Sequence, residues 1–215
     1  MQAKEYLKYV VEEIHSTVFA TIDDAGRPVT CAIDMMDYDK NSLYFLTARG
    51  KSFYQRLKSH EDIAFTAMKG KDTLSCIAVS IRGKAREIGQ EMLPALFEKN
   101  AYMKKIYPGE PSRSALTVFQ IYEGFGEWFD LSKLPVERAS FSFGGAQEKQ
   151  GGYYVTDKCI GCGSCYSQCP QKCIDITQKP VIIRQENCIH CGSCFEKCPT
   201  QAIEAIKDDD TGRKA

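Results

Sequence analysis

The order of hydrophobic and polar residues divides the first two thirds of the chain into an opening helix and a β-rich stretch. Tyr6, Leu7, Val10, Val11 and Ile14 recur at helical spacing, which predicts an amphipathic helix. The apolar period then changes to two in the runs VFATI, VTCAIDMMDYD, SLYFLTA, EDIAFTA, CIAVSIRGKAREI and ALTVFQIYEGFGEWFDL. Short Gly, Asp and Asn turns separate these runs. Five or six such strands favour an antiparallel barrel.

Two helical insertions interrupt the strands. The segment GKSFYQRLKSH, between the third and fourth runs, is expected to be a helix. Gln90 to Tyr107 predicts one or two more, which Pro108, Gly109 and Pro111 would end. The fold class is therefore α+β in this part of the chain.

A change in composition predicts a second, smaller domain. FGG and QGG bracket a polar stretch and indicate a flexible joint. We expect a first domain at 1–143, a linker at 144–153, a second domain at 154–207 and a polar tail at 208–215. In the second domain, CIDITQKPVIIRQENC predicts a strand, a turn at Lys179-Pro180 and another strand.

Charge and the N-terminal segment limit the possible partners. Lys+Arg and Asp+Glu both number 28, so the formal net charge is zero. This argues against nucleic acid or an anionic membrane as the main partner. The opening MQAKEYLKYVVEEIH has no long apolar core and predicts neither a signal peptide nor a membrane span. We therefore expect a cytoplasmic protein, in which clustered cysteines more often bind metal than form disulfides.

Nine of the eleven cysteines lie between positions 159 and 198, in two similar runs. CIGCGSCYSQCPQKCI is repeated 29 residues later as CIHCGSCFEKCPTQAI, and both contain C-x2-C-x2-C-x3-C-P. A tetrahedral zinc site usually takes its four ligands from two distant pairs. Zinc knuckles and a disulfide framework are alternatives, but neither explains the proline after the fourth cysteine together with the repeat.

This spacing is typical of bacterial ferredoxins, in which the fourth cysteine of each run ligates the other cluster. Residues 154 to 206 resemble the two-cluster bacterial-type ferredoxins over this motif. One [4Fe-4S] cluster is accordingly assigned to Cys159, Cys162, Cys165 and Cys198, and the other to Cys188, Cys191, Cys194 and Cys169.

Two residues of the motif remain outside these ligand sets. Cys173 corresponds to Ala202 in the second run, so we interpret it as a small apolar filler beside a cluster. A redox or spare-ligand role is the alternative. His190 lies inside the second run, and we interpret it as a neighbour that tunes the cluster, because four thiolates already suffice.

The first domain resembles a flavoprotein family. The leading helix, the hairpin ATIDDAGRPVTCAI and the segment LYFLTARGKSFYQRL resemble the FMN-binding split barrels of the pyridoxamine 5'-phosphate oxidase-like superfamily over residues 3 to 133. The resemblance implies a split barrel and FMN along the second and third strands. It also implies a homodimer with FMN between two barrels. The implied flavin contacts are Ile33, Asp34, Met35, Leu46 and Thr47, and the implied phosphate turn holds Arg49, Lys51 and Ser52.

The chemistry of that turn suits a phosphate. Arg49 can donate two hydrogen bonds to phosphate oxygens, Lys51 adds a charge, and Ser52 stands beside free helix N-terminal amides. The alternative is a solvated basic loop in which Ser52 only caps the helix. Trp128, the only tryptophan, is interpreted as part of the barrel core or as a dimer contact rather than as a residue that stacks on the flavin.

A flavin beside two clusters predicts an oxidoreductase. The chain has no match to the substrate-phosphate helix motif of the vitamin-B6 oxidases, so that activity is not expected. No GxGxxG follows a strand, so electrons are expected to come from or go to a ferredoxin or flavodoxin. We expect an FMN enzyme acting on a small molecule, with catalytic residues unknown. The alternatives are an electron carrier without its own substrate and a redox-sensing ligand-binding module.

Overall fold

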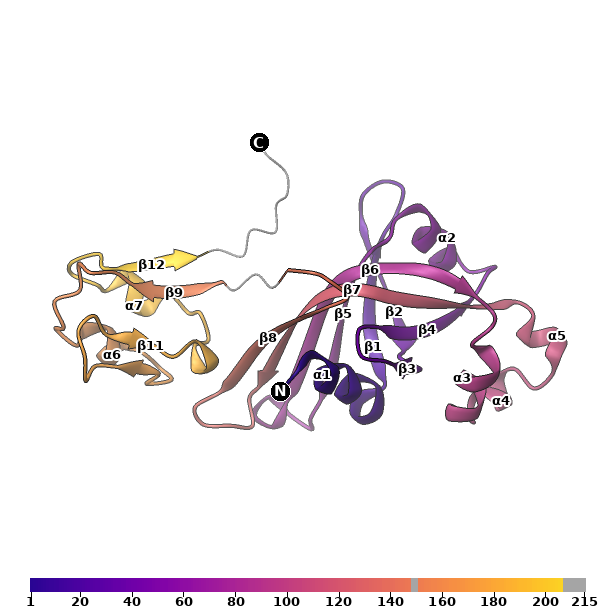
Figure 1. Cartoon of the computed structure of the whole chain (residues 1–215), viewed down its shortest axis with the longest axis horizontal. Coiled ribbons are helices and arrows are strands. Elements are labelled where there is room, and N and C mark those ends of the chain that lie inside the picture. The colour runs from indigo at the N-terminus through magenta and orange to yellow at the C-terminus, as the bar shows by residue number, and fades with distance from the viewer. Residues whose placement is uncertain (148–150, 207–215) are drawn as a thin grey trace. The chain divides into compact units, whose positions relative to one another are not determined.

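The computed structural model describes residues 1–147 and 151–206 (Figure 1). The described chain forms two compact units. Unit 1 contains Met1–Lys69, Ala78–Glu127 and Phe141–Gln147, and unit 2 contains Gly70–Ile77, Trp128–Ser140 and 151–206. Two segments of the β-rich region, Gly70–Ile77 and Trp128–Ser140, therefore belong to the same compact unit as the cysteine-rich segment. The expected tail at 208–215 and residues 148–150 of the expected linker lie outside the described residues.

Unit 1 opens with the predicted amphipathic helix. Helix α1 (Ala3–Tyr9) continues into a wider turn, η1 (Val10–Ile14). Tyr6, Leu7 and Val10 are buried, as their helical spacing predicts. The Tyr6 ring stacks on Phe141 with centroids 4.4 Å apart, so the helix is held against the sheet by an aromatic pair.

The main sheet has eight strands and curls into a half-barrel (Figure 1). Its order is β2-β1-β5-β6-β7-β4-β3, and β8 pairs with β7. The strands are β1 (Ser16–Ile22), β2 (Pro28–Asp34), β3 (Asp37–Tyr38), β4 (Leu43–Ala48), β5 (Asp62–Lys69), β6 (Ile77–Gly89), β7 (Leu116–Asp130) and β8 (Glu137–Phe143). The pairs β1–β2, β1–β5, β3–β4 and β4–β7 are antiparallel. The α+β split-barrel prediction is confirmed.

The chain links the two ends of this sheet order directly. Strand β2 stands at one end and β3 at the other. Between them, the Met35 amide donates to the His15 carbonyl and the Met36 amide donates to the Tyr44 carbonyl, both at 2.8 Å. These two methionines therefore close the half-barrel at the point where β2 ends.

Phenylalanines fill the interior of the half-barrel. Phe19 contacts Phe45, Phe53 and Phe65, with centroid distances of 5.1, 5.5 and 5.8 Å. Phe53 belongs to α2 (Ser52–Ser59), the helix that was predicted in the first insertion. Phe53 and Leu57 bury its apolar face, so this helix is fixed over the barrel interior beside the end of β4.

A second apolar cluster covers the outer face of β4. Helices α3 (Leu93–Lys99) and α4 (Met103–Ile106) confirm the predicted helices between Gln90 and Tyr107. The expectation that Pro111 ends the helical insertion is wrong, because α5 (Glu110–Arg113) begins after Gly109 and holds Pro111 in its first turn, where a missing backbone N–H is tolerated. Leu96 and Phe97 of α3 pack with Tyr44 and Leu46 of β4. Alternate residues of β4 therefore pack into two different apolar clusters, one in the half-barrel interior and one under α3.

Unit 2 carries the cysteine-rich segment on very short elements. These are β9 (Gly152–Val155), α6 (Ser164–Gln168), β10 (Ile174–Asp175), β11 (Ile182–Ile183), η3 (Gln185–Asn187), α7 (Ser193–Glu196) and β12 (Ile203–Ile206). The short helix η2 (Thr73–Ser75) belongs to the same unit but precedes this segment in the chain. Strand β9 pairs with β12 and β10 with β11, both antiparallel. The predicted strand, turn at Lys179-Pro180 and strand are confirmed. Gly163 and Gly192 precede α6 and α7 with φ of 77° and 79°, which favours glycine.

Of the helices within the described ranges, none combines the length and the apolar character that a membrane crossing needs.

Candidate functional site

The thiols of unit 2 border two cavities, one for each predicted cluster. Cys159, Cys162, Cys165 and Cys198 line one cavity, and Cys169, Cys188, Cys191 and Cys194 line the other. The two cavities are nearly equal in size. Each cavity takes its fourth cysteine from the other run, as the predicted exchange of ligands requires.

These thiol positions suit a cluster. Among the described residues, no three His, Cys, Asp or Glu side chains converge closely enough to hold a single metal ion. The thiols instead stand around a cavity, as ligands at the corners of a cubane would. Cys162 Sγ lies 3.4 Å from Ser164 Oγ, and Cys191 Sγ lies 3.5 Å from Ser193 Oγ. The two runs therefore repeat their polar contacts as well as their cysteines.

Cys173 breaks the equivalence of the two cavities. Its side chain is 3% exposed and lines the second cavity, with Sγ 3.5 Å from that of Cys169. A hydrogen bond to Cys188, burial and Cys169 all raise the pKa of Cys173. The same bond lowers the pKa of Cys188 to about 6, helped by the His190 amide and the charge of Arg138. The Cys173 thiol is thus a buried donor facing two predicted ligands.

The predicted flavin contacts lie near the corner where the half-barrel closes. Ile33 and Asp34 end β2 and are partly exposed, whereas Met35 is fully buried. Leu46 and Thr47 point to opposite faces of β4, because side chains alternate along a strand. Leu46 packs under α3. Thr47 Oγ1 is buried and has no hydrogen-bond partner within the described residues, which suits a hydroxyl that a bound group would satisfy.

The predicted phosphate turn is exposed between β4 and α2. The Arg49 guanidinium donates to the Ser114 carbonyl. Lys51 is the N-cap of α2 and Ser52 its first residue, and no side chain caps the helix. Ser52 is therefore not the N-cap, and the first amides of α2 receive no hydrogen bond from a cap side chain.

Arg56, which the sequence interpretation did not single out, adds a positive charge beside this turn. Burial raises the pKa of the Cys31 thiol on β2, and the charges of Arg56 and Lys51 oppose that shift. Arg56 also donates from Nε to Thr21 Oγ1 at 2.8 Å. Arg56 follows Ser52 by four residues, so both lie on one face of α2. This helical spacing was the available signal for Arg56. In the structure the charges of Arg56 and Lys51 both reach Cys31 on β2.

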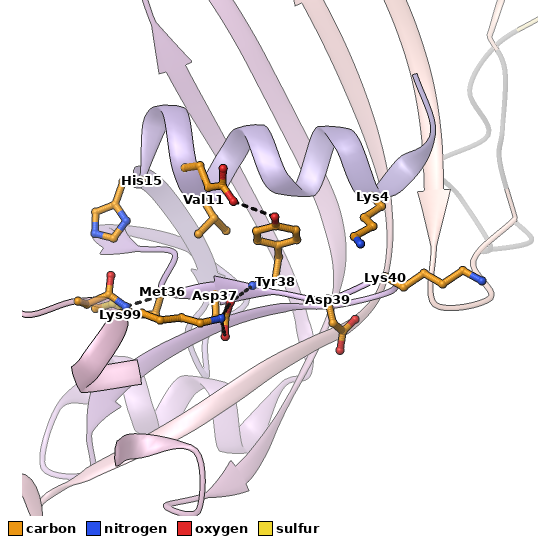
Figure 2. A pocket seen from close by; sticks show the side chains of 11 residues that line it. Lys4, Val11, His15, Met36, Asp37, Tyr38, Asp39, Lys40 and Lys99 are labelled. Carbon is orange, nitrogen blue, oxygen red and sulfur yellow. Dashed lines mark hydrogen bonds and ion pairs between the residues drawn. The ribbon is translucent and has the colours of Figure 1, made fainter. Parts of the chain in front are cut away.

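Unit 1 also contains a polar cavity of about 590 Å³ beneath its N-terminal helix. Figure 2 shows His15 and Lys4 on the helical side and the β3 segment opposite them. The carboxylates of this cavity are engaged: Glu12 accepts from Tyr38 at 2.8 Å, Asp37 from Lys99 at 2.6 Å and Asp39 from Tyr44 at 2.6 Å. Lys4 and Lys40 make no such contact in the described part of the chain. Together with Lys99 they balance the three carboxylates of the lining, so its formal charges sum to zero.

A hydrogen-bonded chain joins this cavity to the predicted flavin segment. Tyr102 donates to Asp34 Oδ2 at 2.7 Å, and Ser16 donates to Asp34 Oδ1 at 2.6 Å. The single hydroxyl proton of Tyr102 is therefore committed, and His15 Nε2, at 2.8 Å, donates to the Tyr102 oxygen. Burial raises the pKa of Asp34, but the bonds from Ser16 and Tyr102 outweigh it and hold that pKa below its usual value.

Sequence reasoning had not identified His15 and Tyr102, which stand 87 positions apart. His15 has φ of 69° and ψ of −60°, a backbone conformation unfavourable for a residue with a β-carbon. Burial and Asp34 both raise the pKa of Tyr102, so its proton stays in place. The strained turn positions an imidazole at the cavity wall.

Comparison with protein families gave two matches. The family described as "Pyridoxamine 5'-phosphate oxidase" matches residues 3–122, and the family described as "4Fe-4S dicluster domain" matches residues 158–202. A comparison with curated proteins found no match.

Solved structures share the fold of the first part of the chain. A NimC/NimA family protein from Clostridium acetobutylicum is 16% identical, with a TM-score of 0.52 over 65% of this chain and 88% of that one. A heme binding protein from Mycobacterium smegmatis is 14% identical, with a TM-score of 0.53 over 70% of this chain and 62% of that one. At these identities the likeness concerns the fold alone.

Proposed function

The chain belongs to the pyridoxamine 5'-phosphate oxidase family, and from this premise we propose that it is an FMN-dependent oxidoreductase that uses two [4Fe-4S] clusters. A flavin-binding type of barrel and a 4Fe-4S dicluster domain on one chain support a redox electron-transfer role. The observation that carries the proposal is the arrangement of the thiols, in which each predicted set of four borders its own cavity. A cluster exchanges one electron at a time, and bound flavin supplies both one- and two-electron chemistry.

FMN is the flavin that the site suits. Lys51 and Arg56 bring two positive charges close to Cys31, and the first amides of α2 stand beside them. This arrangement fits one phosphate group. The Thr47 hydroxyl, which is buried without a partner within the described residues, would gain one from the flavin.

The cavity of Figure 2 is the proposed place for the small-molecule substrate. His15 stands at its wall and is linked through Tyr102 to Asp34, beside the proposed flavin. The residues of this chain can hold a proton at His15 and keep Asp34 ionised. Lys4 and Lys40, which make no ion pair within the described residues, are available to contact an anionic group of that substrate.

We also propose a homodimer that exchanges electrons with a ferredoxin or flavodoxin. Val18 on β1 and Met68 on β5 are 61% and 63% exposed, and they offer apolar surface on the outer side of the sheet. In contrast, Phe119, Ile121 and Trp128 in FQIYEGFGEWF are buried within the chain. Strands β1 and β5 therefore offer apolar surface to a partner copy.

The test is rapid mixing of the anaerobically purified protein with a reduced ferredoxin. Cluster and flavin absorbance would be followed separately, with a Cys169→Ser/Cys198→Ser variant as the control that lacks intact clusters. We expect flavin reduction in the parent and a strong loss of its rate in the variant. Flavin reduction at the same rate in both would contradict the proposal. Intramolecular transfer without any small-molecule oxidant of the flavin would favour a carrier.

A further inference from the structure

The two cysteine runs differ at one backbone position that requires a left-handed conformation. Gly161 of the first run has φ of 74°, and its equivalent in the second run, His190, has φ of 54°. Glycine adopts this conformation freely, whereas a residue with a β-carbon is strained in it. A histidine at this position indicates that its side chain makes a contact of its own.

That contact is with Arg138, on strand β8. Both residues belong to unit 2, and Arg138 Nη1 donates to His190 Nδ1. A guanidinium is always protonated and can only donate, so Nδ1 accepts and the ring proton is on Nε2. The positive charge of this pair is therefore that of the arginine.

The strand that carries Arg138 is fixed to the second cavity by two more hydrogen bonds. The Val136 amide donates to Gln171 Oε1 at 2.9 Å, and Asn187 Nδ2 donates to the Val136 carbonyl at 3.0 Å. Gln171 lines the second cavity, and Asn187 precedes the ligand Cys188. Arg138 is therefore held at a set position beside this ligand set.

The first ligand set has no equivalent of this arrangement within the described residues. A β-carbon at Gly161 would meet the aliphatic stem of Lys179 at 3.8 Å, but Lys179 is exposed. Arg138 is only partly exposed, so water and salt screen its charge less. The two clusters are thus related by an internal repeat but differ in their charged surroundings.

We propose that Arg138 makes the second cluster, held by Cys169, Cys188, Cys191 and Cys194, the higher-potential one of the pair. A nearby positive charge stabilises the reduced form of a cluster, which carries one more negative charge. One electron added to the oxidised pair then resides mainly on the second cluster. Electrons would then pass from the first cluster to the second. The charge of Arg138 thus determines which of the two clusters holds the electron. This order of transfer rests on the proposed function, but the difference in potential does not.

The test is redox titration of the intact protein, followed by the electron paramagnetic resonance of the reduced clusters. The parent should give two one-electron steps. Arg138→Gln should lower the higher potential and leave the lower one unchanged. We expect roughly a tenfold change in the partition of the electron, which is about 59 mV for a one-electron couple. Arg138→Lys keeps the charge and should retain most of the difference.

Arg184→Gln is the matched control. Arg184 lies in the same unit, is exposed and pairs with Asp175 at 3.7 Å, so its loss should change neither potential by a comparable amount. A shift of the lower potential in Arg138→Gln, or no shift with both clusters intact, would overturn the inference. So would an equal shift in Arg138→Gln and Arg138→Lys, which would indicate packing rather than charge. Because the readout concerns the clusters alone, it holds even if no flavin is bound.

Discussion

The thiol of Cys173 lies 3.5 Å from that of Cys169, whereas the equivalent position in the second run is Ala202, which is 1% exposed. One repeat therefore presents a buried S–H group to its ligands, and the other presents a methyl group. A thiol in this position can donate to a sulfur ligand but is not needed to complete a set of four.

We expect Cys173→Ala to keep both clusters. Ala202 shows that an alanine fits the equivalent place, so the change removes a hydrogen-bond donor and little packing. Iron and acid-labile sulfide should remain at about eight per chain, as two four-iron clusters require. The loss of four irons would instead identify Cys173 as a ligand.

Replacing a crossing cysteine should damage the cluster that is built mainly by the other run. Cys198 lines the cavity of the first run and Cys169 that of the second. Cys198→Ser should therefore perturb the cluster of Cys159, and Cys169→Ser that of Cys188. Iron analysis and paramagnetic resonance of each variant measure this, with Cys173→Ala as the control. A stoichiometric zinc content without sulfide in the parent protein would refute both assignments.

The phosphate site can be tested by comparing three basic residues. The charges of Lys51 and Arg56 both act to lower the pKa of the Cys31 thiol, whereas the Arg49 guanidinium donates a hydrogen bond to the Ser114 carbonyl. The double change Lys51→Ala/Arg56→Ala should weaken FMN binding by roughly 2–4 kcal/mol if both make charge-assisted bonds. Fluorescence titration of flavin-free protein measures the affinity. Arg49→Ala is the comparison, and a larger loss there would return the phosphate to Arg49.

How well a site can be predicted from the sequence depends on how far apart its residues stand along the chain. The cysteine sets depend on a local spacing that is repeated, so the sequence alone predicts which thiols face each cavity. Arg56 is one helical turn beyond Ser52 and could have been found from that spacing. His15 and Tyr102 are 87 positions apart, and Arg138 and His190 are 52 apart. No local pattern relates such pairs, because the folding of the sheet brings them together.

The dimer is expected to depend on the outer side of β1 and β5. Val18 pairs with Thr66 across these strands and is 61% exposed. If a second copy covers this face, Val18→Asp would bury an unpaired charge and should give a monomer in light scattering. Leu134→Asp makes the same kind of change at a residue that is 93% exposed elsewhere, and it should leave the assembly unchanged. A parent protein that is monomeric with full FMN would contradict the proposed assembly.

The bond from Tyr102 to Asp34 should make stability depend on pH in a defined direction. The hydrogen bonds from Ser16 and Tyr102 hold the pKa of Asp34 below its usual value despite partial burial. A carboxyl group with a lowered folded-state pKa stabilises the fold above its unfolded pKa, which is about 3.9, and loses that contribution as pH falls through the folded pKa. Tyr102→Phe should therefore destabilise the protein at pH 7, by less than about 1 kcal/mol because water screens this partly exposed site. The difference from the parent should shrink in acid, where Asp34 is protonated in both proteins. Urea unfolding at a series of pH values measures it, and Ser16→Ala, which removes the other donor, should follow the same trend. A difference that stays constant down to acid pH would show that Tyr102 acts through packing and not through the ionised carboxylate.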